Sequence, residues 1–331
     1  MKIGALPVEP ALGVAPMAGM TDTAFRRLVK RHGGCGLVVT EMVSAEGLVR
    51  GIDRTLEYAD YTDEERPISI QIFGGDPAKM ADAAQIVEAM GADIVDVNMG
   101  CPVPKIAKHN AGCSLMREPA HAASVIAAMA KAVRIPVTVK MRAGWNDDDR
   151  NAPALARMVQ DAGAQAVAVH GRTAAQSYSG LADWDLVVRI AGDLAIPVFG
   201  SGDCVEPEQI VERMRSGVEG VLVGRGVLRN PWILAQATDL AAGRPKRVVT
   251  LDDRGRFLLD YIDLLLKERV DEARAVSHDR WVVNKIRALG SWYTKGLDNG
   301  SHLRTAINSA SSLAMLRDEI ATFFFCPLGV V

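Results

Sequence analysis

The amino-acid sequence predicts an α/β protein, a TIM (β/α)8 barrel followed by a small C-terminal helical-bundle domain. Eight short apolar runs, separated by amphipathic or alanine-rich segments, occupy the first 245 residues, and from about residue 250 only helical periodicity is found. Near-continuous apolar strands indicate a parallel sheet that is buried on both faces. Eight β/α units within about 250 residues are typical of a closed barrel.

Strands and helices are expected to alternate along most of the barrel. The strands are expected at 12–15, 37–40, 68–73, 93–98, 137–141, 166–170, 197–200 and 220–224. The helices between them are expected at 21–32, 77–90, 119–133, 152–162, 205–215 and 231–242. Gly243-Arg244-Pro245-Lys246 is a cluster of helix-breaking residues. We therefore expect a barrel domain over 1–245 and a helical domain over 246–331.

The composition limits the classes of function. The chain has 331 residues, a formal net charge of −2 and five cysteines. This charge gives no overall attraction to nucleic acid or membrane, so any site for a polyanion must be local. The cysteines are scattered and odd in number, which does not indicate a disulfide framework, and none forms the Cys-x-x-Cys pair of a zinc site. The N-terminus lacks the apolar region of a signal peptide, and no stretch approaches the ~18 apolar residues of a membrane span. We expect a reduced, soluble, cytoplasmic protein with no metal and no membrane partner.

Polar and small residues gather where the expected strands end. The chemistry of a (β/α)8 barrel is found at the C-terminal ends of its strands. A barrel made only for stability has no reason to place amide, ammonium and imidazole groups at successive strand ends. In chain order, these ends carry Pro16, Met17, Glu41, Gln71, Asn98, Lys140, His170, Ser201, Gly202, Gly224 and Arg225.

Two glycine-containing loops, GSGDC (200–204) and GVLVGRG (220–226), follow the last two expected strands. In such barrels these loops commonly bind phosphate, and Arg225 adds a charge-assisted clamp. Tight turns would also explain the glycines, and a satisfied core histidine would explain His170. Lys140, however, is costly to bury unless an anion pairs with it. Together with the amides at neighbouring strand ends, these groups suit the edge of a flavin, which carries negative charge when reduced.

Several motifs closely resemble those of the tRNA-dihydrouridine synthases, most of all the bacterial B-type branch. They are PMAGMTD (16–22), QIFG (71–74), VDVNMGCPVPKIAKHNAG (95–112), VKMRAGW (139–145), VHGRT (169–173), SGDC (201–204), GRG (224–226) and NPW (230–232). The resemblance covers the whole chain, since SWYTKG (291–296) is similar to a motif of the family's C-terminal helical domain. It implies an FMN-dependent oxidoreductase that reduces the C5–C6 bond of a uridine in the tRNA D-loop, with NADPH as reductant. The B-type branch suggests position 17, and the family suggests a monomer.

The resemblance also implies roles for individual residues. Cys101 matches the catalytic cysteine, and Asn98 lies beside it on the substrate side of the flavin. FMN-contacting positions are matched by Pro16, Met17, Gln71, Lys140, His170, Ser201, Gly202, Asp203, Gly224 and Arg225. Where the family usually has Asn-Gly-Asp, this chain has Ser201-Gly202-Asp203, which removes one amide contact.

Cys101 suits the role of a proton donor. When hydride arrives at C6 of uracil from N5 of the reduced flavin, C5 needs a proton from the other side. A thiol of ordinary pKa, ~8.5, is mostly protonated near pH 7 and can serve as that general acid. A small buried hydrophobe is the alternative for any cysteine. The flanking Gly100 and Pro102, with a polar loop beyond them, favour the proton donor.

A substrate as large as tRNA requires further contacts. The uridine must be extruded from its stack, and RNA binding draws on phosphate contacts. The expected tRNA contacts are Asn98, Lys105, Lys108, Arg172, Lys285, Arg287 and Lys295. The last three lie in a basic stretch that also contains Trp281, Trp292 and Tyr293. A solvated helix face with its aromatics in the core, Trp292 among them, explains that stretch about equally well. Ala288 stands where related chains often carry a basic residue or histidine.

Two other functions stay open at this point. A free-pyrimidine flavoenzyme resembling the dihydroorotate dehydrogenases would share the barrel, FMN and a pyrimidine substrate, but it would not need Lys105, Lys108 or the basic C-terminal helices. A tRNA-binding or folding protein whose barrel has lost its chemistry would be colourless.

Overall fold

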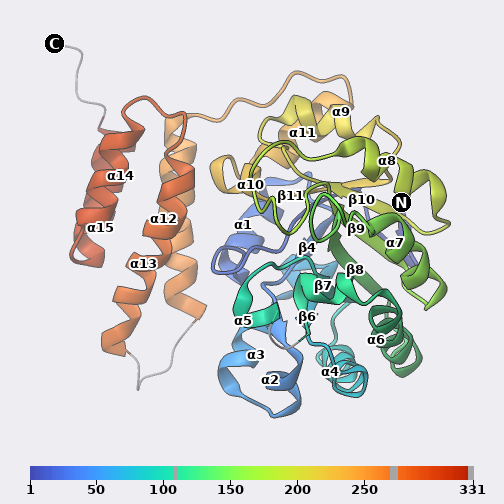
Figure 1. Cartoon of the computed structure of the whole chain (residues 1–331). Helices are drawn as coiled ribbons and strands as arrows, with labels where there is room; N and C mark the ends of the chain where they lie inside the picture. Colours follow the sequence, from blue (N-terminus) through green and yellow to red (C-terminus); the bar gives the residue numbers. More distant parts are fainter. Residues whose placement is uncertain (108–109, 269–274, 327–331) are drawn as a thin grey trace.

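Eight parallel strands close into a barrel in the computed structural model, which describes residues 1–107, 110–268 and 275–326 (Figure 1). The ring follows chain order, and the pairings of β4 with β6 and of β3 with β11 close it. The barrel strands are β3 (Leu12–Val14), β4 (Leu37–Val39), β6 (Ile68–Phe73), β7 (Ile94–Met99), β8 (Val137–Arg142), β9 (Ala166–His170), β10 (Val198–Ser201) and β11 (Gly220–Val223). The predicted barrel and its eight strands are confirmed.

Three short strands lie outside the predicted set. β5 (Val43–Ser44) pairs in parallel with the end of β6. β1 (Lys2–Ile3) and β2 (Leu6–Pro7) form an antiparallel hairpin. Ile3 packs with Leu37, Phe199 and Leu222 in a small apolar cluster, so the hairpin closes the end of the barrel where the strands begin.

The alternation of side chains along each strand separates the core from the site. Every second residue of β6, β7 and β8 is apolar and joins the main core. These residues are Ile68, Ile70, Ile72, Val95, Val97, Val137 and Val139. The opposite positions point into the barrel and are polar toward the strand ends, because side chains alternate with a period of two. The register places Asn98 opposite Lys140, and Arg142 and Ser201 both opposite His170.

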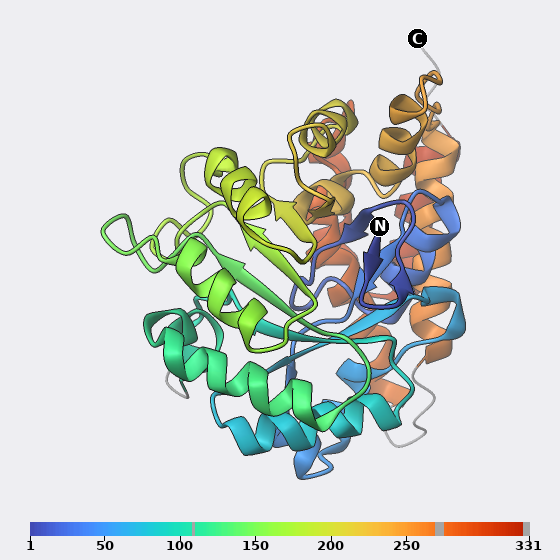
Figure 2. The same cartoon turned by 90° about the vertical axis from the view of Figure 1, so that its right-hand side faces the viewer.

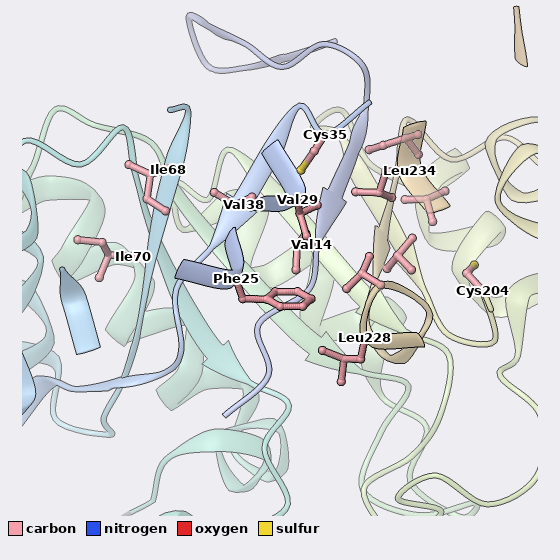
Figure 3. Packing of buried hydrophobic residues seen from close by; sticks show 14 of the residues in the cluster. Val14, Phe25, Val29, Cys35, Val38, Ile68, Ile70, Cys204, Leu228 and Leu234 are labelled. Atoms are coloured by element: carbon pink, nitrogen blue, oxygen red, sulfur yellow. The ribbon is translucent and has the colours of Figure 1, made fainter. Parts of the chain in front are cut away.

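The outer core lies between the strands and the surrounding helices. Figure 3 shows Val14 and Val38 of adjacent strands beside Phe25 and Val29 of α1. The barrel helices are α1 (Thr23–His32), α2 (Ala45–Val49), α3 (Asp53–Ala59), α4 (Pro77–Ala89), α5 (Pro104–Ala107), α6 (Pro119–Ala132), α7 (Ala152–Asp161), α8 (Trp184–Asp193), α9 (Pro207–Met214), α10 (Arg225–Arg229) and α11 (Ile233–Ala241), with 3-10 turns η1 (Asp63–Glu65) and η2 (Gly112–Arg117). No helix of the described residues is long and apolar enough to cross a membrane.

The six predicted barrel helices are present; α2, α3, α5, α8 and α10 were not among them, and the longest of these five is α8. Its sequence contains Val187, Val188 and Ile190, and β-branched residues lower helix propensity. The helix nevertheless forms, and Asp183 caps its N-terminus: the Asp183 carboxylate accepts a hydrogen bond from the Leu186 amide at 2.9 Å.

Four C-terminal helices stand together at one side of the barrel (Figures 1 and 2). They are α12 (Leu251–Glu268), α13 (Ala275–Tyr293), α14 (Gly300–Ser309) and α15 (Leu313–Phe325). An extended segment joins them to α11, and Arg247 holds it by donating to the Asp239 carboxylate at 2.8 Å and to the His32 carbonyl at 2.9 Å. The helical content is as predicted, while the division into two domains at 245 stays a proposal.

Aromatic rings fasten the C-terminal helices to the barrel. Phe257 of α12 lies 6.1 Å from Phe25 and 5.6 Å from Trp232, measured between ring centroids, and stacks on Tyr293 of α13 at 5.5 Å. Such pairs add to the stabilisation from burial alone. Phe257 therefore joins two barrel helices to two C-terminal helices.

We expect Phe257→Ala to destabilise the protein by about 3–5 kcal/mol, because it removes a buried ring and leaves a cavity at this junction. The free energy of unfolding in urea measures the loss. Leu251→Ala, in the same helix at a side chain that is 52% exposed, is the control and should change stability little. Equal losses in both variants would contradict a junction centred on Phe257.

Candidate active site

A small cavity of ≈ 80 Å³ opens at the C-terminal ends of the barrel strands. Its lining comes from the ends of β3, β8, β9, β10 and β11. It consists of Ala15, Pro16, Met17, Lys140, His170, Tyr178, Ser201, Gly202, Asp203, Cys204, Val205, Gly224, Arg225 and Gly226. The structure thus brings together nine of the ten residues predicted to bind a cofactor, and only Gln71 lies outside the lining.

Two glycines leave room in this cavity. Gly202 has φ +125°, and a Cβ there would lie 2.6 Å from Ala182 Cβ and 3.1 Å from His170 Cδ2. A Cβ at Gly224 would approach only Met17 Sδ at 3.7 Å and Ala15 Cβ at 3.9 Å, so it would stand in the cavity itself. Gly202 therefore requires the absence of a side chain, whereas a side chain at Gly224 would fit the protein but take up space in the cavity.

The cavity contains the ammonium group of Lys140. Among the described residues, no hydrogen bond or ion pair reaches Lys140 Nζ. The pKa of Lys140 is lowered to about 8, chiefly by burial and also by the charge of nearby Arg142, while Asp96 offsets part of both effects. Burial likewise lowers the pKa of His170 to about 2, with Lys140, Arg142, Arg172 and Arg225 acting in the same direction. The imidazole is therefore neutral, whereas the ammonium is largely charged at neutral pH and would be stabilised by an anion.

Arg172 and Asp203 join two loops around the cavity. Arg172 donates to Asp203 Oδ1 at 2.6 Å and to the carbonyls of Ser179 and Gly180 at 3.1 and 2.6 Å. Asp203 Oδ2 accepts from the Ala182 amide at 2.7 Å. Arg172 is only 2% exposed. Arg172 therefore holds the loops after β9 and β10, and its contact with tRNA stays a prediction.

A relay of hydrogen bonds runs from the barrel interior to Cys101. The Asp96 carboxylate accepts from Thr138 Oγ1 and from Gln71 Nε2, each at 2.6 Å. Asn98 Nδ2 donates to Gln71 Oε1 at 2.7 Å. Asn98 Oδ1 in turn accepts from the amides of Gly100 and Cys101 at 3.1 and 2.9 Å. Gln71 therefore acts through Asn98 on the loop that carries the cysteine.

Cys101 is half-buried at the start of this loop. Burial raises the pKa of its thiol, and a hydrogen bond from the Val103 backbone and the charge of Arg142 offset only part of the rise. The Cys101 carbonyl accepts from the Cys113 amide at 3.0 Å, which closes the loop. The thiol is protonated at neutral pH and remains within reach of solvent. Lys105, on α5 in the same loop, is exposed, and Lys108 lies outside the described residues.

Sequence reasoning missed Arg142 and Tyr178. Arg142 is buried and donates to the Gly100, Thr173 and Ser177 carbonyls at 2.8, 2.9 and 2.9 Å. It lies two residues after Lys140 on the same inward face of β8, so the strand period could have found it. Tyr178 lines the cavity with Arg225 over its ring at 4.7 Å, and its irregular loop gave no periodic signal.

The basic residues predicted on the C-terminal helices have different environments. Arg287 donates to the Ala310 carbonyl at 2.9 Å, at the end of α14. Lys285 Nζ lies 2.9 Å from Asp22 Oδ2. Both are thus engaged within the protein, and their contact with tRNA stays a prediction. Lys295 is exposed, with its ammonium 4.0 Å from the ring centre of Trp292. Trp292 was expected in the core; it is half-buried and packs against the core.

A larger cleft of ≈ 680 Å³ lies between the barrel and α13. Its walls include Gly19, Asp22 and Glu41 from the barrel, and Lys285 and Ala288 from the helix. Related chains often have a basic residue or histidine at the position of Ala288, so α13 lacks a cation at this position of the cleft wall. The loop after β3 lines both spaces, because Met17 lines the small cavity and Gly19 lines the cleft.

Comparisons with known proteins agree with the motifs. The family model described as dihydrouridine synthase matches residues 13–324. The chain is 36% identical to the probable tRNA-dihydrouridine synthase of Rickettsia bellii over 327 residues, which covers 98% of each chain. It is 36% identical to the tRNA-dihydrouridine synthase B of Xanthomonas campestris, covering 96% of this chain and 95% of that protein. It is 35% identical to the tRNA-dihydrouridine synthase B of Pseudomonas aeruginosa, covering 98% and 96%.

Proposed function

The chain belongs to the dihydrouridine synthase family, whose members are oxidoreductases acting on tRNA, and we propose that it uses FMN and NADPH to reduce the C5–C6 bond of a D-loop uridine. One observation carries this proposal: an ammonium with no hydrogen-bond or ion-pair partner in the described part of the chain shares one cavity with a neutral imidazole and two glycine-containing loops. This family membership also argues against the two alternatives left open by the sequence.

The residues around the cavity fit an FMN molecule. The phosphate would lie against the loops of Gly202 and Gly224, where a side chain would fill the space, with Arg225 as its cationic partner. Lys140 would pair with the anionic edge of the reduced ring, and this pairing would compensate the cost of burying its charge. Pro16, Met17, His170, Ser201 and Asp203 complete the lining. FMN, when bound, supplies the hydride that reaches C6 of uracil.

Cys101 is proposed as the acid that protonates C5. Its raised pKa keeps the proton on sulfur at neutral pH, as a general acid requires. Asn98 and Arg142 fix the loop from both sides, because Asn98 accepts from the Cys101 amide and Arg142 donates to the Gly100 carbonyl. The thiol therefore has a defined starting position before substrate arrives.

The proposal includes how tRNA is held. Exposed Lys105 and Lys295, together with Lys108, would contact RNA phosphates or the extruded nucleotide. The region after 245 would act as the tRNA-binding domain. Modification at position 17, action as a monomer and a cytoplasmic location are further parts of the proposal.

We expect the purified protein to be yellow, to be bleached by NADPH and then to reduce uridine in tRNA. Mass spectrometry of tRNA from a strain lacking the protein, before and after incubation with it, would show the gain of two hydrogen atoms and its position. Free uridine and orotate are the controls. A colourless protein, or turnover of the free pyrimidines alone, would contradict the proposal.

We expect Cys101→Ala to slow dihydrouridine formation by about 10²–10⁴-fold, the usual contribution of a general acid. FMN content and flavin reduction by NADPH should be unchanged, because the thiol does not line the cofactor cavity. Single-turnover reaction of the reduced enzyme with tRNA measures the step. Cys326→Ala, at an exposed cysteine near the C-terminus, is the matched control. Full activity of Cys101→Ala would place the acid elsewhere.

We expect Lys140→Met to weaken FMN binding and to remove its pH dependence. Because the pKa of Lys140 is lowered to about 8, the ammonium is charged below that pH and neutral above it. FMN affinity of the unaltered protein should therefore fall as pH rises above 8, or somewhat higher if the bound anion raises the pKa. Quenching of flavin fluorescence measures the affinity, and exposed Lys79→Met is the control. A pH profile shared by all three proteins would rule out this role.

A further inference from the structure

The turn after β3 connects the cofactor cavity with the C-terminal helices. Met17 lines the cavity, and its carbonyl accepts from the amides of Met20 and Thr21 at 3.0 and 3.1 Å. The Thr21 hydroxyl accepts from the Met17 amide at 3.1 Å. Gly19, at the tip, has φ +78°, a conformation that favours glycine. The position of Met17 thus depends on how this turn is held.

Both peptide groups of Gly19 are held by charged side chains. Its amide donates to Glu41 Oε2. Its carbonyl accepts from Lys285 Nζ, which comes from α13, at 3.0 Å. The same ammonium lies 2.9 Å from Asp22 Oδ2 and 3.5 Å from Glu41 Oε1. An ammonium has three donors, and these three oxygens account for them.

The cluster is shielded from water. The side chains of Lys285, Asp22 and Glu41 are 15%, 14% and 7% exposed. Burial lowers the pKa of Lys285, but the two carboxylates raise it by more, so the net effect is a raised pKa. Removing the ammonium would leave two carboxylates close together with no cation between them, and such buried pairs are costly to break.

Asp22 extends the cluster into both parts of the chain. Its Oδ1 accepts from the Phe25 amide and caps α1, while its Oδ2 also accepts from the Tyr261 hydroxyl of α12 at 2.8 Å. Lys285 therefore touches the turn, the start of α1 and, through Asp22, a second C-terminal helix. Its donors are not directed at an external phosphate.

We propose that Lys285 is a positioning residue for the cofactor site: from α13 it holds the Met17–Asp22 turn in place, so that the seating of the C-terminal helices sets the position of Met17 at the cavity. This inference rests on the proposed function. It also gives the C-terminal helices a role in the chemistry of the barrel besides binding RNA.

The test compares Lys285→Met with Lys295→Met, a change of the exposed lysine just after the same helix. For each protein, FMN affinity is measured by fluorescence without tRNA, the visible circular dichroism of the bound flavin is recorded, and kcat and KM for tRNA are determined. We expect Lys285→Met to weaken FMN binding, alter the dichroism and lower kcat by about 10- to 100-fold, the effect of a small misplacement. KM for tRNA should stay close to that of the unaltered protein. Lys295→Met should raise KM for tRNA and leave the flavin signals unchanged.

A raised KM with unchanged FMN affinity and dichroism in Lys285→Met would overturn the inference, because Lys285 would then act as an RNA contact. If that variant fails to fold, the double variant Lys285→Met with Glu41→Gln, which removes one of the two uncompensated carboxylates, is compared with Glu41→Gln alone in the same measurements. Failure of the unaltered protein to bind FMN would overturn the proposed function and this inference with it. Normal FMN binding in all variants would overturn the inference alone.

Discussion

The carboxylate of Asp96 is the polar centre on which the catalytic face depends. It lies inside the barrel, where burial raises its pKa, and hydrogen bonds from Gln71 and Thr138 offset part of that cost. Gln71 can donate to Asp96 only by presenting its oxygen to Asn98, which must then turn its own oxygen toward the Cys101 amide. In this series of hydrogen bonds, Asp96 fixes the orientation of the Gln71 amide, and Gln71 fixes the orientation of the Asn98 amide. The loop that carries the thiol is thereby anchored to three neighbouring strands.

The charged groups around the cavity fall into two kinds. Arg142 and Arg172 are buried and donate hydrogen bonds to backbone carbonyls, and Arg172 also donates to Asp203. They therefore hold the loops after β7, β9 and β10 in place. Lys140 has no such partner among the described residues. A partnerless ammonium beside glycine-lined backbone is what a buried site for an anion requires. The two arginines thus hold the loops of the site in place, and the ammonium of Lys140 remains able to pair with an anion.

Much of the barrel and its inward ring could be predicted from the sequence, because both follow from local pattern. Apolar runs gave the strands, and the period of two places Gln71, Asn98, Lys140 and His170 at their ends on the inner face. The partners of basic residues could not be predicted in this way. Lys285 and Arg172 look like surface cations in the sequence, but Lys285 pairs with Asp22 on a distant part of the chain and Arg172 with Asp203 on the next loop. No local signal distinguishes a lysine that faces solvent from one that faces a buried carboxylate.

Burial also sorts the titratable groups at the strand ends into different roles. In each of Cys101, Lys140 and His170, desolvation is the largest influence on the pKa, and it favours the neutral form. For the thiol the neutral form keeps its proton, whereas for the imidazole it has already lost one. His170 therefore has no acidic proton to give near neutral pH, and Lys140 stays largely charged there. Of these three groups, only Cys101 is both neutral and still protonated. Burial therefore removes the acidic proton of His170 but keeps the proton of the thiol available for donation.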